Sequence, residues 1–140
     1  MKKILVINGP NLNMLGLREP HIYGSRTYCD LVGYIKDYCK DRCEIEFFQS
    51  NHEGAIIDSI QSAYRKFDGI VINAGGYTHT SVAIADAIST VQVPTVEVHI
   101  SDITKREEFR KHSYLTAVCA QTIMGHGFDG YNMAIDFLLK

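Results

Sequence analysis

The 140-residue sequence has few cysteines, and their spacing does not favour a metal site or a disulfide framework. There are four, at Cys29, Cys39, Cys43 and Cys119, and no two of them form a CxxC pair. A zinc site needs closer and better matched ligand pairs. A chain of this length can also bury a core without disulfide staples. We therefore expect reduced cysteines, no bound metal, and a protein of the cytoplasm.

An excess of basic residues is also absent. Lysine and arginine number 14 and aspartate and glutamate 16, so the formal net charge is −2. Because proteins that bind nucleic acid or anionic membranes carry a basic surface, we expect neither partner. The longest strongly apolar runs, such as residues 4–7, are far shorter than the ~20 residues of a membrane-spanning helix. Lys2 and Lys3 imitate the start of a signal peptide, but the apolar stretch behind them ends at Asn8.

The chain has the size of one domain and the composition of a globular protein. Hydrophobic residues make up 46% and charged residues 21%, which excludes a disordered chain and a collagen-like fibre. At about 150 residues per domain, residues 1–140 are predicted to form a single domain. No linker, internal repeat or low-complexity tract interrupts it.

Strand-like runs alternate with segments of helical period along the whole sequence. The predicted strands cover residues 2–8, 44–49, 69–73, 95–100 and 117–124, and all but one are rich in Val and Ile. The helical period predicts helices over residues 27–41, 55–67, 79–91 and 131–138. Thr27 and Asp30 have the spacing of a capping box. The faces expected to be buried are Leu31, Ile35 and Tyr38; Ile56, Ile60, Ala63 and Phe67; Val82, Ala85 and Ile88 or Ser89; and Tyr131, Ala134, Ile135 and Leu138.

This alternation predicts an α/β domain of the flavodoxin-like type. Right-handed crossovers favour a five-stranded parallel sheet of order 2-1-3-4-5 with helices on both faces. In such sheets ligands bind beyond the carboxyl ends of the strands, where the strand order reverses. The polar residues expected to line that crevice are Asn11, Arg18, Tyr23, Asn73, His79, Glu97, His99 and Ser101. Five of the six histidines are predicted at this edge, and His112 is the exception.

Several motifs common on this fold are missing. The sequence contains no GxGxxG and no GxxxxGK[ST], the fingerprints of dinucleotide and P-loop sites. Asn8 and Asn73 stand where a phosphoreceiver would have aspartates, and the first loop, GPNLNMLG, has no hydroxyl for the phosphate of FMN. Lys105 is the one lysine near the strand-end motifs, so a Schiff base is not expected. Dense Asn, His, Tyr and Arg favour a small polyhydroxylated or carboxylated substrate and proton transfer. A small-ligand module, a receiver-like regulator and a flavin electron carrier remain as alternatives.

Five segments resemble, in order and spacing, the motifs of the type II dehydroquinase (3-dehydroquinate dehydratase) family. They are residues 9–13 (GPNLN) with 18–20 (REP) and 23–24 (YG), 49–54 (QSNHEG), 73–81 (NAGGYTHTS), 97–101 (EVHIS) and 106–110 (REEFR). The resemblance covers nearly the whole chain. It implies an enzyme of the shikimate or quinate pathway that removes water from 3-dehydroquinate by anti elimination through an enolate, giving 3-dehydroshikimate. It also implies that no metal or organic cofactor is used.

The resemblance assigns a role to each matching residue. Tyr23 would be the base that takes the proton α to the ketone, with Arg18 favouring its tyrosinate. His99 would protonate the leaving hydroxyl, with Glu97 orienting its ring. Asn11 would help to hold a water against the enolate oxygen. Substrate would be bound by Asn73, His79, Asp86, Ile100, Ser101 and Arg110.

The resemblance further implies an assembly. Family members form dodecamers built from trimers, in which Asp86 matches an aspartate donated to the neighbouring subunit's site. A homododecamer is therefore expected, with residues 18–24 as a mobile lid. The sequence departs from the family pattern at Ala85, where many members carry arginine, and at Asp102, where asparagine is usual.

Overall fold

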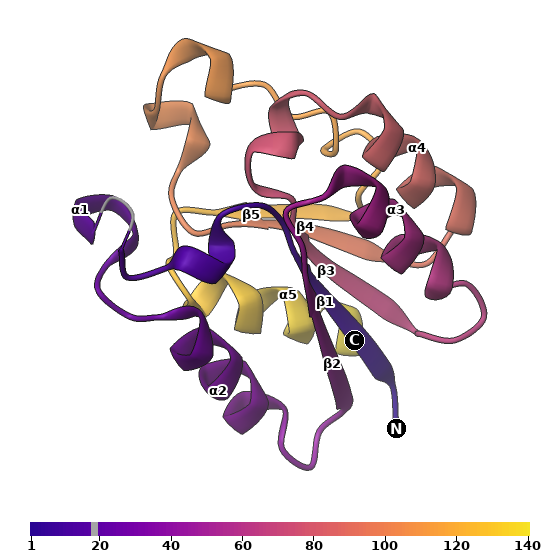
Figure 1. Cartoon of the computed structure of the whole chain (residues 1–140). Helices are drawn as coiled ribbons and strands as arrows, with labels where there is room; N and C mark the ends of the chain where they lie inside the picture. The colour runs from indigo at the N-terminus through magenta and orange to yellow at the C-terminus, as the bar shows by residue number, and fades with distance from the viewer. Residues whose placement is uncertain (18–19) are drawn as a thin grey trace.

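The computed structural model describes residues 1–17 and 20–140 of the chain. Its strands form a five-stranded sheet in the order β2-β1-β3-β4-β5, and every neighbouring pair is parallel (Figure 1). The strands are β1 (Lys3–Asn8), β2 (Glu44–Gln49), β3 (Gly69–Asn73), β4 (Thr95–His99) and β5 (Gln121–Met124). The predicted strand order is confirmed.

Helices cover both faces of this sheet, as predicted. They are α2 (Tyr28–Cys39) and α5 (Asp129–Leu139) on one face and α3 (Glu53–Ser62) and α4 (Val82–Val91) on the other. The short α1 (Pro20–Tyr23) lies in the first loop, away from both faces (Figure 1). Successive side chains of a strand point to opposite faces, so Ile4 and Val6 of β1 pack with α2 and α5, while Leu5 and Ile7 pack with α3 and α4. The two apolar layers bury the sheet between them (Figure 1). No described helix is both long and apolar enough to cross a bilayer.

The predicted helix starts and faces are partly confirmed. The capping box is present, because Asp30 N–H donates to Thr27 Oγ1 at 3.2 Å and Thr27 N–H donates to Asp30 Oδ2 at 2.9 Å. In α2, however, the third buried position belongs to Cys39, and Tyr38 is half-buried with its hydroxyl on Asp136. The predicted buried face of α5 is confirmed. The helix predicted over residues 55–67 ends at Ser62, so Ile56 and Ile60 are buried from α3, while Ala63 and Phe67 are buried from the segment that follows it.

The helix predicted over residues 79–91 begins later. Residues Gly75–His79 form a 3₁₀ helix, η2, and α4 starts only after Ser81, whose hydroxyl caps it by accepting from Ile84 N–H at 3.0 Å. This start rotates the buried face, so Val82 is 52% exposed instead of buried. Ala85 and Ile88 are buried as predicted, and Ser89 is exposed.

The fifth strand is shorter than predicted. Pairing with β4 begins at Gln121, and the preceding residues turn back on themselves, since the N–H groups of Val118 and Cys119 both donate to the Leu115 carbonyl at 3.0 Å. Val118 and Cys119 pack against the layer formed by α3 and α4. Val118 and Cys119 therefore cover the core from a turn, not from a strand, while Ala117 and Ala120 are exposed.

Three further 3₁₀ helices occupy segments expected to be loops. They are η1 (Leu12–Met14), η3 (Ile103–Lys105) and η4 (Glu108–Arg110). All three follow the carboxyl end of a strand, where they shape the edge at which ligands bind in such sheets.

Candidate active site

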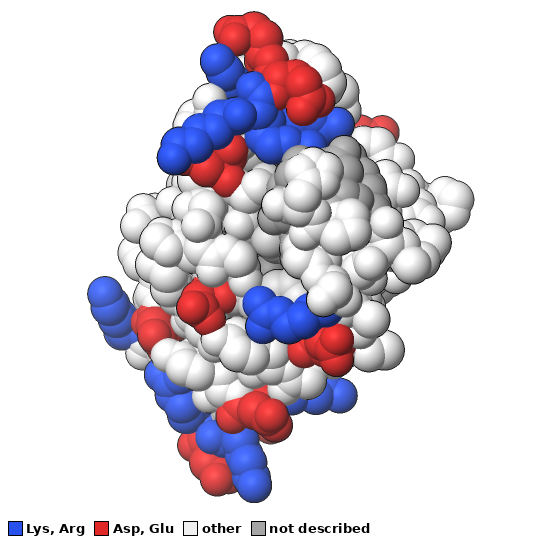
Figure 2. Space-filling model, turned by 90° about the vertical axis from the view of Figure 1, so that its left-hand side faces the viewer, with Lys and Arg blue, Asp and Glu red and all other residues white. Residues whose placement is uncertain are grey.

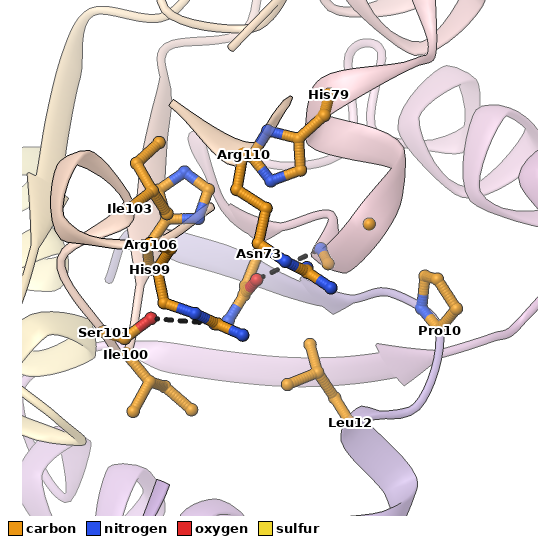
Figure 3. A pocket seen from close by; sticks show the side chains of 12 residues that line it. Pro10, Leu12, Asn73, His79, His99, Ile100, Ser101, Ile103, Arg106 and Arg110 are labelled. Atoms are coloured by element: carbon orange, nitrogen blue, oxygen red, sulfur yellow. Dashed lines mark hydrogen bonds between the residues drawn. The ribbon is translucent and has the colours of Figure 1, made fainter. Parts of the chain in front are cut away.

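A cavity of about 50 Å³ lies beyond the carboxyl ends of β3 and β4, bordered by the first loop (Figure 3). At this place the strand order reverses, because β2 lies on one side of β1 and β3 on the other. The residues lining it are Pro10, Leu12, Asn73, Gly75, Gly76, His79, His99, Ile100, Ser101, Ile103, Arg106 and Arg110. The site predicted from the strand ends thus coincides with a hollow of the structure.

Two glycines allow the first loop to lie against η2 at this point. A Cβ on Gly9 would stand 2.4 Å from the Ala74 carbonyl oxygen. Gly75 has φ +59°, and a Cβ there would stand 3.0 Å from the Pro10 carbonyl oxygen. Larger residues would separate the two backbones, so these glycines set the width of the cavity floor.

His99 and Glu97 form a pair at the end of β4. They lie two residues apart, so their side chains share one face of the strand. His99 Nε2 is 2.5 Å from Glu97 Oε2, and both residues are buried. The ring nitrogen bound to the carboxylate carries hydrogen, which leaves Nδ1 as the atom that can meet a ligand.

Glu97 is held as an anion although it is fully buried. Burial acts to raise its pKa, but hydrogen bonds from His99, Ser113 and Thr116 outweigh burial and keep the pKa of this carboxyl below its ordinary value. This fixed carboxylate holds the His99 ring by its Nε2 edge and so orients Nδ1 away from Glu97.

His79, on η2, is fixed by a backbone contact. Its Nδ1 lies 2.7 Å from the carbonyl oxygen of His112, which can only accept, so Nδ1 carries the hydrogen. Burial lowers the pKa of His79, and the nearby charges of His99 and Arg110 act in the same direction. A neutral ring with hydrogen on Nδ1 leaves Nε2 to accept a hydrogen bond from a ligand hydroxyl.

Asn73, the last residue of β3, is buried and oriented from two sides. Its Nδ2 donates to the Tyr131 hydroxyl at 3.0 Å, and its Oδ1 accepts from Gly75 N–H at 3.2 Å. Tyr131 in turn donates to Asn8 Oδ1 at 2.6 Å, and burial raises the pKa of this phenol. The amide keeps one N–H and one lone pair for a ligand.

Two arginines supply positive charge to the cavity. Arg106 and Arg110 reach it from the η3–η4 segment, and both side chains are drawn with Asn73 in Figure 3. Arg106 Nη1 lies 3.4 Å from Ser101 Oγ, and Arg110 Nε lies 2.9 Å from Glu107 Oε2. Figure 2 shows basic side chains gathered with acidic ones over this segment, at the top of the face. The cavity is suited to a carboxylate next to hydroxyl groups.

The structure brings together some of the predicted site residues and separates others. Those that line the cavity are Asn73, His79, His99, Ile100, Ser101 and Arg110, with Glu97 directly behind His99. Asn11 does not line it; its backbone has φ 70° and its N–H donates to Asn51 Oδ1 at 3.0 Å. Asp86 is exposed on α4 and also lies outside the lining.

The predicted base and its arginine cannot be placed against this cavity. Arg18, the first residue of the expected lid, falls outside the described residues. Tyr23 is the last residue of α1, but its side chain is likewise outside the described part of the chain. Their roles stay predictions.

Sequence reasoning missed several residues that contact the site. Arg106 belongs to a segment already matched to the family, so its place in the motif could have identified it. Ser113, Thr116 and Tyr131 follow no strand end and carry no motif. His112, expected away from this edge, contacts His79 through its backbone carbonyl. These contacts depend on tertiary folding alone.

Asp102, at which the sequence departs from the family pattern, forms its hydrogen bonds within its own segment. Its Oδ1 accepts from Thr104 N–H at 3.0 Å and from Thr104 Oγ1 at 2.6 Å, which caps η3. These bonds lower its pKa, and Asp102 does not line the cavity. Within residues 1–17 and 20–140, no group of three or more His, Cys, Asp or Glu side chains is arranged to hold a metal ion.

Comparisons with known proteins agree on one family. The family model described as dehydroquinase class II matches residues 2–139. The chain is 58% identical over 142 residues to a 3-dehydroquinate dehydratase of Fusobacterium nucleatum, covering 99% of this chain and 97% of that protein. It is 53% identical over 138 residues to catabolic 3-dehydroquinase 1 of Fusarium vanettenii, covering 98% and 96%. The crystal structure of a type II dehydroquinase from Butyrivibrio crossotus matches with a TM-score of 0.97 at 56% identity, covering 99% and 98%.

Proposed function

The chain belongs to the class II dehydroquinase family, and on that premise we propose that it is a 3-dehydroquinate dehydratase, a hydro-lyase that forms 3-dehydroshikimate. The observation that carries this proposal is the buried Glu97–His99 pair, at 2.5 Å, opening onto a cavity lined by amide, imidazole and guanidinium groups. Such a cavity has an acid for a leaving hydroxyl and partners for a hydroxylated carboxylate substrate. Of two relatives of similar identity, one is named 3-dehydroquinate dehydratase and the other catabolic 3-dehydroquinase 1, and the enzyme name implies the shikimate pathway.

The elimination needs a base and an acid on the substrate. We assign the base to Tyr23, whose phenolate takes the proton α to the ketone and leaves an enolate, with Arg18 stabilising the phenolate charge. The enolate then re-forms the ketone while the carbon–oxygen bond to the leaving hydroxyl breaks. His99 Nδ1 donates its proton to that hydroxyl, so water departs and the ring becomes neutral. The Nε2–H group of the ring remains hydrogen-bonded to Glu97.

The remaining groups bind the substrate and stabilise developing charge. The backbone N–H groups of Ile100 and Ser101, with the Ser101 hydroxyl, are assigned to the carboxylate. Arg106 lies next to this position, 3.4 Å from Ser101 Oγ, and adds positive charge there. We assign to Asn73, His79 and Arg110 the binding of the substrate hydroxyl groups. Asn11 is assigned to a water that stabilises the enolate oxygen.

The test of this function is a direct assay. The purified protein should convert 3-dehydroquinate to the conjugated enone 3-dehydroshikimate, followed by its absorbance, at the same rate with and without a metal chelator. A colourless protein would at the same time exclude the flavin carrier. Absence of any enone would refute the assignment, and loss of activity with the chelator would refute a metal-independent reaction.

Covalent catalysis by a lysine is the chemical alternative. The cavity lining contains two arginines and two histidines, and no lysine among the residues described there. Borohydride added with substrate should therefore leave activity unchanged, because no imine forms for it to reduce. A reduced substrate adduct on any lysine, detected by mass spectrometry, would contradict the enolate mechanism.

We further propose that the protein acts in the cytoplasm as a homododecamer whose catalytic domain spans residues 1–140, with Asp86 completing a neighbour's site. Asp86 lies one turn after Val82 in α4, and both are exposed. Ala85 between them is buried. An aspartate on this outward face cannot serve its own cavity, but it is accessible to another copy.

Mixed assemblies test the shared site. Asp86→Ala subunits and Tyr23→Phe subunits should each be poorly active alone, because each lacks one part of a composite site. After they are unfolded together and refolded, activity should return at sites that combine a normal Tyr23 with a neighbour's normal Asp86. Wild-type enzyme carried through the same steps is the control. Hybrids no more active than their parents would contradict sharing, even if sedimentation reports a dodecamer.

A further inference from the structure

Three hydroxyl groups surround the carboxylate of Glu97 and account for its remaining hydrogen bonds. Thr116 Oγ1 and Thr122 Oγ1 donate to Oε1 at 2.8 and 3.0 Å. Ser113 Oγ donates to Oε2 at 2.7 Å, the oxygen that also bonds His99. Two partners therefore contact each oxygen of a side chain that has no exposure to solvent.

The direction of these bonds is fixed by chemistry. An ionised carboxylate can only accept, so each hydroxyl must donate to it. Ser113 Oγ also accepts from Leu115 N–H at 3.0 Å, which directs its hydroxyl hydrogen toward Glu97. Neutral donors of this kind stabilise the charged form of Glu97 without offering a competing positive charge.

The segment formed by residues 112–116 also reaches the second histidine of the cavity. The carbonyl of His112 accepts from His79 Nδ1, and Tyr114 N–H donates to the Thr78 carbonyl of η2 at 3.0 Å. The same short segment thus contacts η2 through its backbone and β4 through its hydroxyl groups. Its position is set by both elements that carry the cavity's histidines.

We propose that Ser113, Thr116 and Thr122 are positioning residues for the dehydration, acting through Glu97 to hold the His99 ring in one orientation, with Nε2 on Glu97. This inference rests on the proposed function, because it concerns the acid of that reaction. None of the three hydroxyls lines the cavity, so they influence the substrate only through the Glu97–His99 pair.

The other titratable groups near Glu97 do not replace these donors. Burial and the charge of Glu97 raise the pKa of the Cys119 thiol to about 12, so it stays neutral. His79 has a lowered pKa and is engaged with the His112 carbonyl, while Arg110 lies beyond it, bonded to Glu107. His99 is therefore the partner through which Glu97 acts.

Thr122→Val tests this proposal, since valine keeps the shape and removes one donor. Losing one hydrogen bond to a charged group should lower kcat about tenfold and leave KM nearly unchanged. The pH profile of kcat should keep its limbs while its height falls, because Tyr23 sets the acidic limb and the pKa of Glu97 lies below its ordinary value. Thr122→Ser, which keeps the hydroxyl, should restore kcat. Ser113→Ala is a second variant with the same expectation.

Thr95→Val is the matched control. Thr95 is a buried threonine at the opposite end of the same sheet, and its hydroxyl donates to the Val93 carbonyl at 2.8 Å. This variant should lose some thermal stability but keep the wild-type kcat. The proposal is overturned if Thr122→Val and Ser113→Ala also lower only the melting temperature, with kcat unchanged. A wild-type protein without dehydratase activity would instead refute the proposed function as well.

Discussion

Replacing His99 by asparagine is expected to lower kcat by about 10²–10⁴-fold, the usual effect of losing a positioned proton donor. The asparagine amide matches the Nδ1 position and does not reach the Nε2 position, but Glu97 keeps its three hydroxyl donors, so the fold should persist. It cannot give a proton to the leaving hydroxyl, and hydroxide is a poor leaving group. The loss should therefore appear in kcat, with KM changed far less, in steady-state assays of enone formation.

His126→Asn provides the control for this variant. His126 is an exposed histidine in the loop after β5, at the same edge of the sheet, and it does not line the cavity. Its activity should remain close to that of the wild type. Near-normal turnover by His99→Asn would remove His99 from the mechanism.

Tyr23→Phe is expected to have an effect of similar size, because phenylalanine cannot take the proton α to the ketone. Free tyrosine has a pKa near 10, and bringing it to about 7 takes about 4 kcal/mol, which a close guanidinium such as that of Arg18 could largely supply. Turnover should fall by about 10²–10⁴-fold, with substrate affinity largely retained.

The comparison variant for Tyr23 is Tyr64→Phe, which removes the hydroxyl of an exposed tyrosine, 54% accessible, that lies outside the cavity lining. It should leave activity unchanged. If Tyr23→Phe turns over substrate as fast as Tyr64→Phe, the base must be another residue.

Much of the fold could be predicted because burial leaves a simple pattern in the sequence. The Val- and Ile-rich runs of β1 and β3 are buried on both faces, so they read as continuous apolar segments. The error at α4 arose because the Ser81 cap sets where the helix begins, and a cap shifts which side chains turn inward. The error at residues 117–120 arose because apolar residues in a turn can cover the core as a strand does.

Some residues of the site could likewise be predicted from the sequence, and others could not. His99, Asn73 and Ser101 lie at strand ends, so the rule for parallel sheets is enough to place them at one edge. Ser113 and Thr116 reach Glu97 from one short segment and Thr122 reaches it from β5, at 16, 19 and 25 residues along the chain. Nothing in their local sequence indicates that contact, which depends on how the chain returns from η4 to β5.

The burial of the Tyr131 hydroxyl has an optical consequence. The chain has eight tyrosines and no tryptophan, so its near-ultraviolet spectrum is dominated by phenol groups. Burial raises the pKa of Tyr131 and Tyr28, and a hydrogen bond to Asp129 raises that of Tyr34, so these chromophores stay un-ionised around neutrality. A phenolate band that develops near pH 7 in the wild type and is missing from Tyr23→Phe would therefore report the ionisation of the proposed base directly. Such a band would make the proposed base its own spectroscopic probe, with no need for an introduced label.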